Sequence, residues 1–353
     1  MKARTLKLVN FRNYKEKILV FDPSSTLIVG PNGSGKTNLL EALFLLATGK
    51  SFKAETTKQL INWQENYSII EAKLTNNQQI GIKIVTSPET KIVKKIFFIE
   101  GSQKTRKFFL ENFWAIIFRP EDIRILSGSP SKRREFLDNI LSQTDWQYQK
   151  NLYVYQKALR QRNKLLEKIR SGQAKTQELF YWDKALVKNG QYISDLRKAT
   201  TDCFNQFFEN HPNSEIKALS VKYLANTISE SSLSAKKDSD IKLGHTSIGP
   251  HKDDFYLEAG IFNTENKNVA HWGSRAQQRM AVLGLKLAEL KYIEENIKKQ
   301  PLLLLDDIFS ELDQNHQKLL TEIINHHQTI ITATNKPNNL SWKAGKIIDL
   351  SRG

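Results

Sequence analysis

The sequence contains very little cysteine and no long apolar run. Among its 353 residues Cys203 is the single cysteine, which excludes an internal disulfide framework and a multi-thiolate zinc site. We expect it to be a small buried residue on a helix, in a reducing compartment. The longest apolar stretch, around Leu39 to Ala47, carries Glu41 and is too short to span a membrane. Met1–Val20 lacks the pattern of an export signal, so we predict a cytoplasmic protein without membrane contact.

Acidic residues are also scarce. The chain has 37 Asp and Glu against 53 Lys and Arg, which gives a net charge of +16. A basic surface attracts polyanions through phosphate contacts and counterion release. Because many basic proteins bind nothing in particular, charge alone favours nucleic acid as a partner but does not establish it. A hydrophobic fraction of 39% indicates an ordinary globular core.

Hydrophobic patterns divide the chain into three parts. Residues 1–123 consist mostly of short predicted strands and one helix beginning at Lys36. Residues 124–214 are helical, and two apolar-striped helices on either side of Ser171-Gly172 predict an antiparallel hairpin. Residues 215–353 contain a serine-rich stretch at 225–240, which we expect to be a loop or a poorly ordered connection. An α/β pattern returns after it and includes a predicted helix near residues 315–324.

The clearest motif is Gly30–Thr37, which fits the phosphate-binding P-loop and lies between a predicted strand and a predicted helix. Its glycines let backbone N–H groups face phosphate oxygens, and the helix N-terminus adds partial positive charge. Lys36 can reach the β- and γ-phosphates of ATP, and the Thr37 hydroxyl can bind Mg²⁺. The predicted nucleotide-binding residues here are Gly30, Pro31, Asn32, Gly33, Ser34, Gly35, Lys36, Thr37 and Asn38.

A second motif lies near the other end of the chain. Residues 301–307 form an apolar run that ends in Asp306 and Asp307, the Walker B pattern. Alone, such a run could be a strand entering a turn. Beside a P-loop it predicts that Asp306 holds Mg²⁺ and that Asp307, with Lys36, is catalytic, since Asp307 can orient and deprotonate the attacking water.

Two weaker motifs complete the set. Ser274–Gln278 begins a helix and resembles the signature of ABC ATPases, in which a serine and the helix N-terminus meet the γ-phosphate of the partner subunit's ATP. We assign Ser274 and Gln277 to the nucleotide on this basis. Ser310–Asp313 resembles the D-loop. Each could be an ordinary helix start or turn by itself, but their order and spacing favour an ABC-type ATPase.

The whole chain resembles the RecF family of bacterial recombination mediators, which are related to the SMC and double-strand-break repair ATPases. Besides the motifs above, the resemblance rests on Asn10–Tyr14, Thr48–Phe52, Phe118–Asp122, Gly128–Arg134, Gly249–Asp254 and Leu305–Asp313. It implies an ABC-type head assembled from both chain ends, with a helical second lobe. It further implies an ATP-dependent homodimer that binds gapped or junction DNA and helps to load recombinase, with RecR and RecO as partners. A role for Asn10–Tyr14 near the nucleotide is also implied.

Three positions depart from the family pattern. Ala276 stands where glycine is usual, and Lys252 where arginine is usual. Alanine cannot adopt every glycine conformation, and lysine lacks the bidentate fork of arginine. Thr332 and Thr334 occupy the region where ABC ATPases carry a histidine, and are candidates to sense the γ-phosphate.

Basic residues of the helical part are the predicted DNA contacts, although they could equally form a solvated charged face. They are Lys132, Arg133, Arg134, Lys157, Arg160, Arg162, Lys164, Lys168 and Arg170, with Tyr148, Tyr153 and Tyr155 among them. His251 is expected to support a loop rather than bind metal. The alternative function is the ATPase subunit of a membrane transporter, which the net charge and the absence of a glutamine-led coupling loop at Phe118–Asp122 disfavour. A metabolic P-loop kinase would need neither signature nor D-loop.

Overall fold

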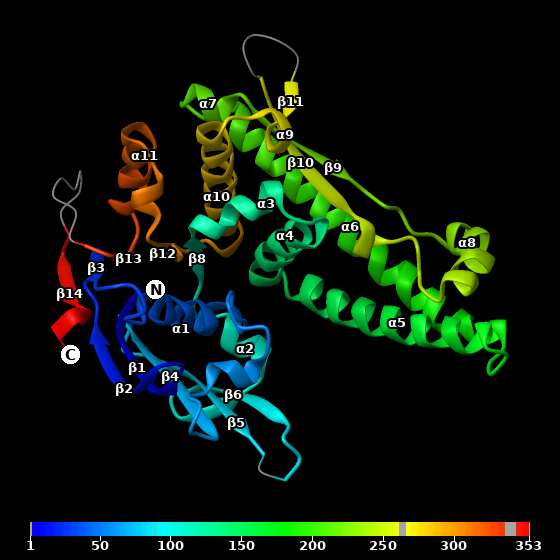
Figure 1. Ribbon diagram of the computed structural model, residues 1–353, viewed down its shortest axis with the longest axis horizontal. Helices are drawn as coiled ribbons and strands as arrows, with labels where there is room; N and C mark the ends of the chain where they lie inside the picture. The colour runs from blue at the N-terminus through cyan, green and yellow to red at the C-terminus, as the bar shows by residue number, and fades with distance from the viewer. Residues whose placement is uncertain (1, 88, 261–265, 336–343, 353) are drawn as a thin grey trace. The chain divides into compact units, whose positions relative to one another are not determined.

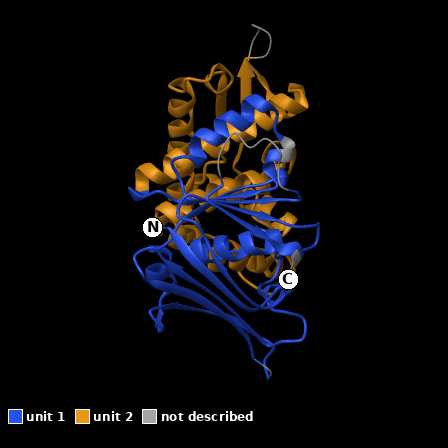
Figure 2. Ribbon diagram, turned by 90° about the vertical axis from the view of Figure 1, so that its left-hand side faces the viewer, with its two compact units in different colours: residues 1–122, 297–353 blue, residues 123–296 orange. Residues whose placement is uncertain are grey.

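The computed structural model describes residues 2–87, 89–260, 266–335 and 344–352. The chain forms two compact units (Figures 1 and 2), the first made of Met1–Asp122 and Ile297–Gly353 and the second of Ile123–Asn296. The predicted α/β unit assembled from both chain ends, with a helical second lobe, is confirmed. Among the helices of the described ranges, none combines the length and the apolar character needed to cross a bilayer.

The predicted division at residue 214 differs from these units, because residues 215–296 belong to the second unit. Strand β9 (Leu219–Leu224) packs against the long helix α6 and pairs with β10 (Asp254–Gly260). Val221 and Leu257, at paired positions, are almost completely buried. Burial against the helices therefore holds this stretch in the second unit.

The centre of the first unit is a parallel sheet in the order β14–β3–β13–β12–β8. Every residue of its three inner strands is buried, and their sequences do not alternate between polar and apolar residues. The strands are β3 (Ser25–Val29), β8 (Ala115–Phe118), β12 (Leu302–Asp306), β13 (Thr329–Ala333) and β14 (Lys346–Asp349).

The first unit also contains an antiparallel sheet in the order β2–β1–β4–β5–β6–β7. Its strands are β1 (Ala3–Phe11), β2 (Tyr14–Val20), β4 (Tyr67–Leu74), β5 (Gln79–Thr86), β6 (Val93–Ile99) and β7 (Ser102–Lys104). Helix α1 (Lys36–Thr48) packs against strands of both sheets, which explains why it is apolar on nearly all sides. Gly49 ends it in the left-handed conformation, with φ 68°.

Shorter helical segments complete the first unit. They are η1 (Thr57–Leu60), α2 (Arg106–Leu110), η2 (Pro120–Ile123, which reaches the boundary), η5 (Ile308–Glu311), α11 (Gln314–Ile324) and η6 (Leu350–Arg352). The helix expected near residues 315–324 is thus confirmed as α11.

The second unit is built around an antiparallel hairpin of α5 (Trp146–Arg170) and α6 (Leu179–Glu209), as predicted. The turn between them contains Gly172 in the left-handed conformation. The remaining elements are α3 (Arg124–Ser127), α4 (Pro130–Thr144), η3 (Thr176–Glu178), α7 (Ser214–Lys217), α8 (Glu230–Leu243), η4 (Pro250–Lys252), β11 (Asn266–Asn268), α9 (Val269–Trp272) and α10 (Arg275–Ile297).

Two local predictions about this unit are wrong. The serine-rich stretch at 225–240 is not simply a loop, because most of it forms α8, whose first turn Ser229 caps by accepting a hydrogen bond from the Ser232 N–H. Leu233 and Asp240 anchor this polar helix by being buried. Cys203 lies on a helix as expected, but it is exposed rather than buried.

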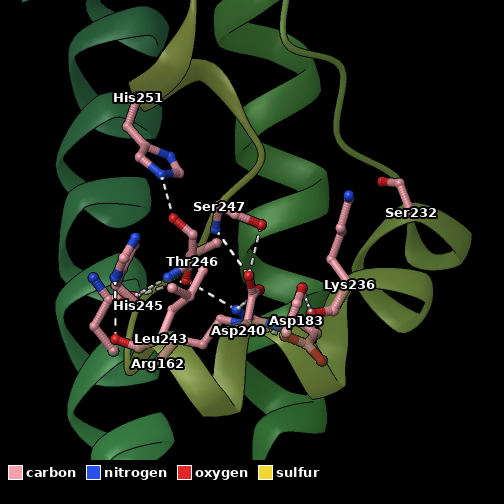
Figure 3. Close-up of polar contacts among 12 residues, drawn as sticks. Arg162, Asp183, Ser232, Lys236, Asp240, Leu243, His245, Thr246, Ser247 and His251 are labelled. Atoms are coloured by element: carbon pink, nitrogen blue, oxygen red, sulfur yellow. Dashed lines mark hydrogen bonds and ion pairs between the residues drawn. The ribbon is translucent and has the colours of Figure 1, made fainter.

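A buried ionic cluster fastens α8 to the hairpin (Figure 3). The Arg162 guanidinium donates 2.7 Å hydrogen bonds to Asp240 and to Asp183, and a 2.9 Å bond to Thr246. Arg162 and Asp240 are both completely buried. Asp240 also accepts hydrogen bonds from the backbone and hydroxyl of Ser247. The Arg162 side chain is therefore buried and paired inside the second unit, where it cannot contact a ligand at the surface.

Candidate functional site

The P-loop joins β3 to α1. Gly33 and Gly35 have φ values of 83° and 97°, in the region that favours glycine. A Cβ on Gly35 would also lie 2.5 Å from the Tyr14 hydroxyl. The Lys36 ammonium lies over the loop and donates to the carbonyls of Gly30 and Pro31 at 2.6 and 3.0 Å. The conformation of the loop therefore requires glycine at positions 33 and 35, and a long cationic side chain at position 36 can extend over it.

The two ends of the chain meet at Thr37 and Asp306. These residues are 269 positions apart in sequence, yet the Thr37 hydroxyl donates to the Asp306 carboxylate at 2.9 Å. Asp306 ends β12 and is buried, with 8% of its surface exposed. A hydroxyl and a carboxylate are the hard oxygen ligands that Mg²⁺ prefers, so the pair fits the predicted metal site. Within the described residues, no group of three or more His, Cys, Asp or Glu side chains forms a metal centre.

Thr332 organises the end of β12 from the neighbouring strand β13. Its hydroxyl donates to Asp306 at 2.7 Å and accepts from the backbone N–H of Asp307 at 3.1 Å. Sequence reasoning made Thr332 and Thr334 candidates for a γ-phosphate sensor, but the contacts of Thr332 are with the two aspartates. Asp307 itself has a φ of 51°, a conformation that costs energy for any residue other than glycine.

A pocket opens beside the first turn of α1. Its volume is about 580 Å³, and its lining consists of Arg12, Asn13, Lys15, Asn38, Lys53, Gln59, Asn62, Trp63 and Gln64. The Asn38 amide donates to Asn13 at 2.8 Å, which joins the predicted Asn10–Tyr14 motif to the P-loop. Trp63 is 98% exposed. Sequence reasoning missed the segment 59–64, which carries no motif.

A buried ion pair supports this pocket. Arg12 makes two hydrogen bonds, of 2.8 and 2.6 Å, to Glu41 in the middle of α1. Glu41 is completely buried and also accepts a hydrogen bond from Ser51. Tyr14 donates its hydroxyl to the Ser34 carbonyl at 3.3 Å, and burial raises the pKa of this hydroxyl from 10.0 to about 12. The Glu41 carboxylate is therefore contacted by two of the motifs on which the family resemblance rests, Asn10–Tyr14 and Thr48–Phe52.

The signature residues belong to the second unit. Ser274 and Gln277 form a reciprocal cap: the Ser274 N–H donates to the Gln277 side chain at 2.8 Å, and the Gln277 N–H donates to the Ser274 hydroxyl at 3.3 Å. Both residues and Ala276 are exposed at the start of α10. In the D-loop, Asp313 caps α11 by accepting from the His316 N–H. The side chains of Ser310 and Glu311 lie outside the described part of the chain.

The predicted DNA contacts differ in exposure and pairing. Lys132 and Arg170 are exposed, and Lys132 pairs with Glu135. Arg133 is paired with Asp254, Arg134 donates to the Asp253 carbonyl, and Arg162 is buried, so these three are corrections to the predicted surface. Tyr148 and Tyr155 are also buried. By contrast, the exposed side of α5 carries a row at helical spacing, which we call the α5 stripe: Lys150, Tyr153, Lys157, Arg160, Lys164 and Lys168.

His251 supports a loop within the second unit. Its ring contacts the Tyr155 hydroxyl at 2.7 Å through Nδ1 and the Thr246 carbonyl at 3.0 Å through Nε2. The adjacent Asp253 is completely buried and accepts from Ser194 and Arg197. The motif Gly249–Asp254 therefore ties α6 to β10. Lys252 remains exposed.

Comparison with known proteins gives matches over the whole chain. Residues 2–349 match the family described as RecF/RecN/SMC N terminal domain. The chain is 37% identical over 358 residues to the DNA replication and repair protein RecF of Natranaerobius thermophilus, covering 95% of this chain and 91% of that protein. It is 35% identical over 356 residues to the protein of the same name from Clostridium tetani, covering 96% and 94%.

Solved structures agree with these matches. The recombination mediator protein RecF of the RecFOR pathway, in its ATPrS form, is similar with a TM-score of 0.84 and 29% identity, covering 98% of this chain and 97% of that one. Its ATP form has a TM-score of 0.84 and 28% identity, covering 99% and 95%. An Smc head bound to the C-winged helix domain of ScpA shares the fold, with a TM-score of 0.51 and 17% identity, covering 99% and 94%.

Proposed function

This chain belongs to the RecF family, and on that premise we propose that it is an ATP-dependent DNA-binding protein of recombinational repair and replication, acting in the cytoplasm. The observation that carries the proposal is the contact between Thr37 and Asp306, because it joins P-loop and Walker B residues from opposite chain ends into one oxygen-rich site. The RecF–ATP relative supports ATP as the nucleotide.

Each residue of the site has a proposed task. The backbone from Gly30 to Asn38 holds the phosphates, and Lys36 faces the β- and γ-phosphates with its positive charge. Thr37 and Asp306 hold Mg²⁺, which supplies charge neutralisation when bound. Asp307 orients the attacking water and accepts its proton. The hydrogen bond from the Asp307 N–H to Thr332 helps to keep that carboxylate in place.

The pocket beside Asn38 suits the adenosine end of the nucleotide. It adjoins the first turn of α1, where the phosphate chain begins, and it offers amide groups and an aromatic side chain. Asn13 and Asn38 can hydrogen-bond to a ribose or a base, and Trp63 has an open face on which a base can stack. The positive charges of Lys15 and Lys53 favour a ligand whose other end is the anionic phosphate chain.

ATP also joins two copies of the chain in this proposal. Ser274 and Gln277 are exposed at the N-terminus of α10, where backbone N–H groups favour an anion. We assign them to the γ-phosphate bound by the partner's P-loop, which gives a symmetric dimer with two composite sites. Hydrolysis removes the shared ligand and lets the dimer open.

The α5 stripe is the proposed DNA surface. Its five cations are exposed and unpaired with acids in the described part of the chain, and Tyr153 is 65% exposed among them. Such a row suits phosphate contacts, with gapped or junction DNA as the target and RecR and RecO as partners in loading recombinase.

Mixing two inactive variants tests the composite sites. Lys36→Ala disables a subunit's own P-loop, and Ser274→Arg disables its signature. A mixed dimer contains one doubly damaged site and one intact site, so ATPase activity should return in the mixture. Mixing Lys36→Ala with Asp307→Asn is the control, because both defects affect a subunit's own nucleotide and each site of the mixed dimer remains damaged.

The alternative outcomes are distinct. If Ser274→Arg mixtures regain no activity while each variant is folded, the signature does not serve the partner's ATP. If Lys36→Ala alone binds fluorescent ATP with wild-type affinity, the placement of the nucleotide is wrong.

A further inference from the structure

We infer that Gln278, which takes no part in the proposed nucleotide contacts, is a positioning residue that holds the signature turn in shape for the partner's ATP. This inference rests on the proposed function. Gln278 follows Gln277 on α10 and is half-buried, whereas its neighbours Ala276 and Gln277 are exposed. It therefore faces the preceding segment rather than the surface offered to a partner.

The Gln278 amide donates to two carbonyls of the single-turn helix α9 and to the carbonyl of Gly273, which follows it. Its Nε2 lies 3.4 Å from the Val269 oxygen, 3.2 Å from the Ala270 oxygen and 3.2 Å from the Gly273 oxygen. Val269 and Ala270 are the first two residues of that turn, and Gly273 is the residue just before Ser274. One side chain thus bridges both sides of the turn that presents the signature serine.

Other contacts also constrain this turn. The Gly273 N–H donates to the Val269 carbonyl at 3.0 Å, and a Cβ on Gly273 would lie 2.7 Å from the same oxygen. The cap between Ser274 and Gln277 fixes the first turn of α10. Gln278 joins this cap to α9, so its loss would let the capped turn, with Ser274, shift relative to α9.

The effect of a substitution at position 278 should depend on whether the new side chain donates or accepts hydrogen bonds. Helix C-terminal carbonyls carry partial negative charge and attract N–H donors and cations. The side-chain hydrogen bonds of Gln278 to Val269, Ala270 and Gly273 all use its NH₂ group as donor. Glutamate has the same shape but only accepts hydrogen bonds, so it would repel the carbonyls. Lysine has donors and no acceptor, so it should keep the bridge.

The test compares Gln278→Glu, Gln278→Lys and Gln278→Leu in the full chain. ATP-induced dimerisation is measured by sedimentation, and ATP affinity of the monomer is measured by titration with fluorescent ATP. We expect Gln278→Glu to weaken dimerisation by on the order of tenfold or more, since small misplacements of binding groups are costly. Leucine should fall between glutamate and lysine, and lysine should stay close to wild type. Monomer affinity for ATP should not change.

Gln206→Glu, on an exposed position of α6, controls for an added negative charge and should dimerise normally. If Gln278→Glu does not fold, the order of the lysine and leucine variants decides the question. Equal dimerisation of the glutamate variant and wild type, or a lysine variant no better than leucine, would overturn the inference. A Ser274→Arg chain that dimerises normally would instead refute the proposed function.

Discussion

Replacing Asp240 by asparagine should destabilise the second unit strongly, although the change is nearly isosteric. Arg162 and Asp240 are both completely buried, and the Asp240 oxygens accept from the guanidinium on one side and from Ser247 on the other. An asparagine amide has to turn its NH₂ group toward one of these donors. Removing one partner of a buried ion pair costs about 3–5 kcal/mol.

The matched change Asp183→Asn affects the same arginine at a more exposed position. Asp183 is 27% exposed, so solvent screens its pairing with Arg162, and the expected loss is about 1 kcal/mol. At roughly 2–4 °C per kcal/mol for a unit of this size, the melting temperature should fall by about 6–20 °C for Asp240→Asn and by about 2–4 °C for Asp183→Asn.

Thermal unfolding followed by circular dichroism measures both shifts, and a DNA titration at several salt concentrations separates stability from binding. Arg162→Gln should also lower the melting temperature but leave the salt dependence of DNA binding unchanged, because a buried guanidinium cannot contact phosphates. Equal melting temperatures for Asp240→Asn and Asp183→Asn would refute the argument from burial. So would a flatter salt slope for Arg162→Gln with unchanged stability.

Three further predictions concern other sites. Asp307→Asn should keep ATP binding but slow hydrolysis, because an amide cannot accept the proton of the attacking water. ATP-induced dimers should then persist in gel filtration, and hydrolysis at the wild-type rate would contradict this. Changing Arg160 and Lys164 together to glutamine should flatten the log–log salt dependence of DNA affinity by about two units with ATP binding intact; an unchanged slope would assign both charges to solvent. Burial first, then the charges of Arg106 and Lys50, lowers the pKa of Lys95 to about 8 from its usual value of 10.5. The unfolded chain therefore binds more protons between these pH values, so stability should rise with pH there, and Lys95→Gln should remove that rise in urea denaturation curves.

Strong local patterns made much of the first unit predictable. The P-loop, the Walker B run and the helix that Gly49 ends all depend on neighbouring residues, and each lies where the sequence indicates. The hairpin was predictable because apolar residues recur at helical spacing over two long segments. Helix α8 was not, since its sequence is polar and its stability comes from Asp240 and Leu233 packing against distant residues.

The DNA contacts could likewise be predicted from the sequence only in part. In sequence, Arg160 and Arg162 look alike, and both were expected to meet DNA. Helical geometry turns Arg160 to solvent and Arg162 into the unit, where Asp240, 78 positions away, neutralises it. Arg133 and Arg134 are likewise held by Asp254 and by the Asp253 carbonyl.

The sequence by itself indicated the ABC-type head fold and the proposed chemistry of this protein, namely which residues would hold phosphates and Mg²⁺. These features can be recognised in short segments, because each depends on a few neighbouring residues. They are the glycines of the P-loop, the long side chain of Lys36 and the strand that ends in two carboxylates. Only the tertiary structure decided which distant partners complete each group. It brought Thr332 to Asp306, Arg12 to Glu41 and Gln278 to the carbonyls before Ser274. Such pairings depend on how strands and helices pack, which no short stretch of sequence encodes.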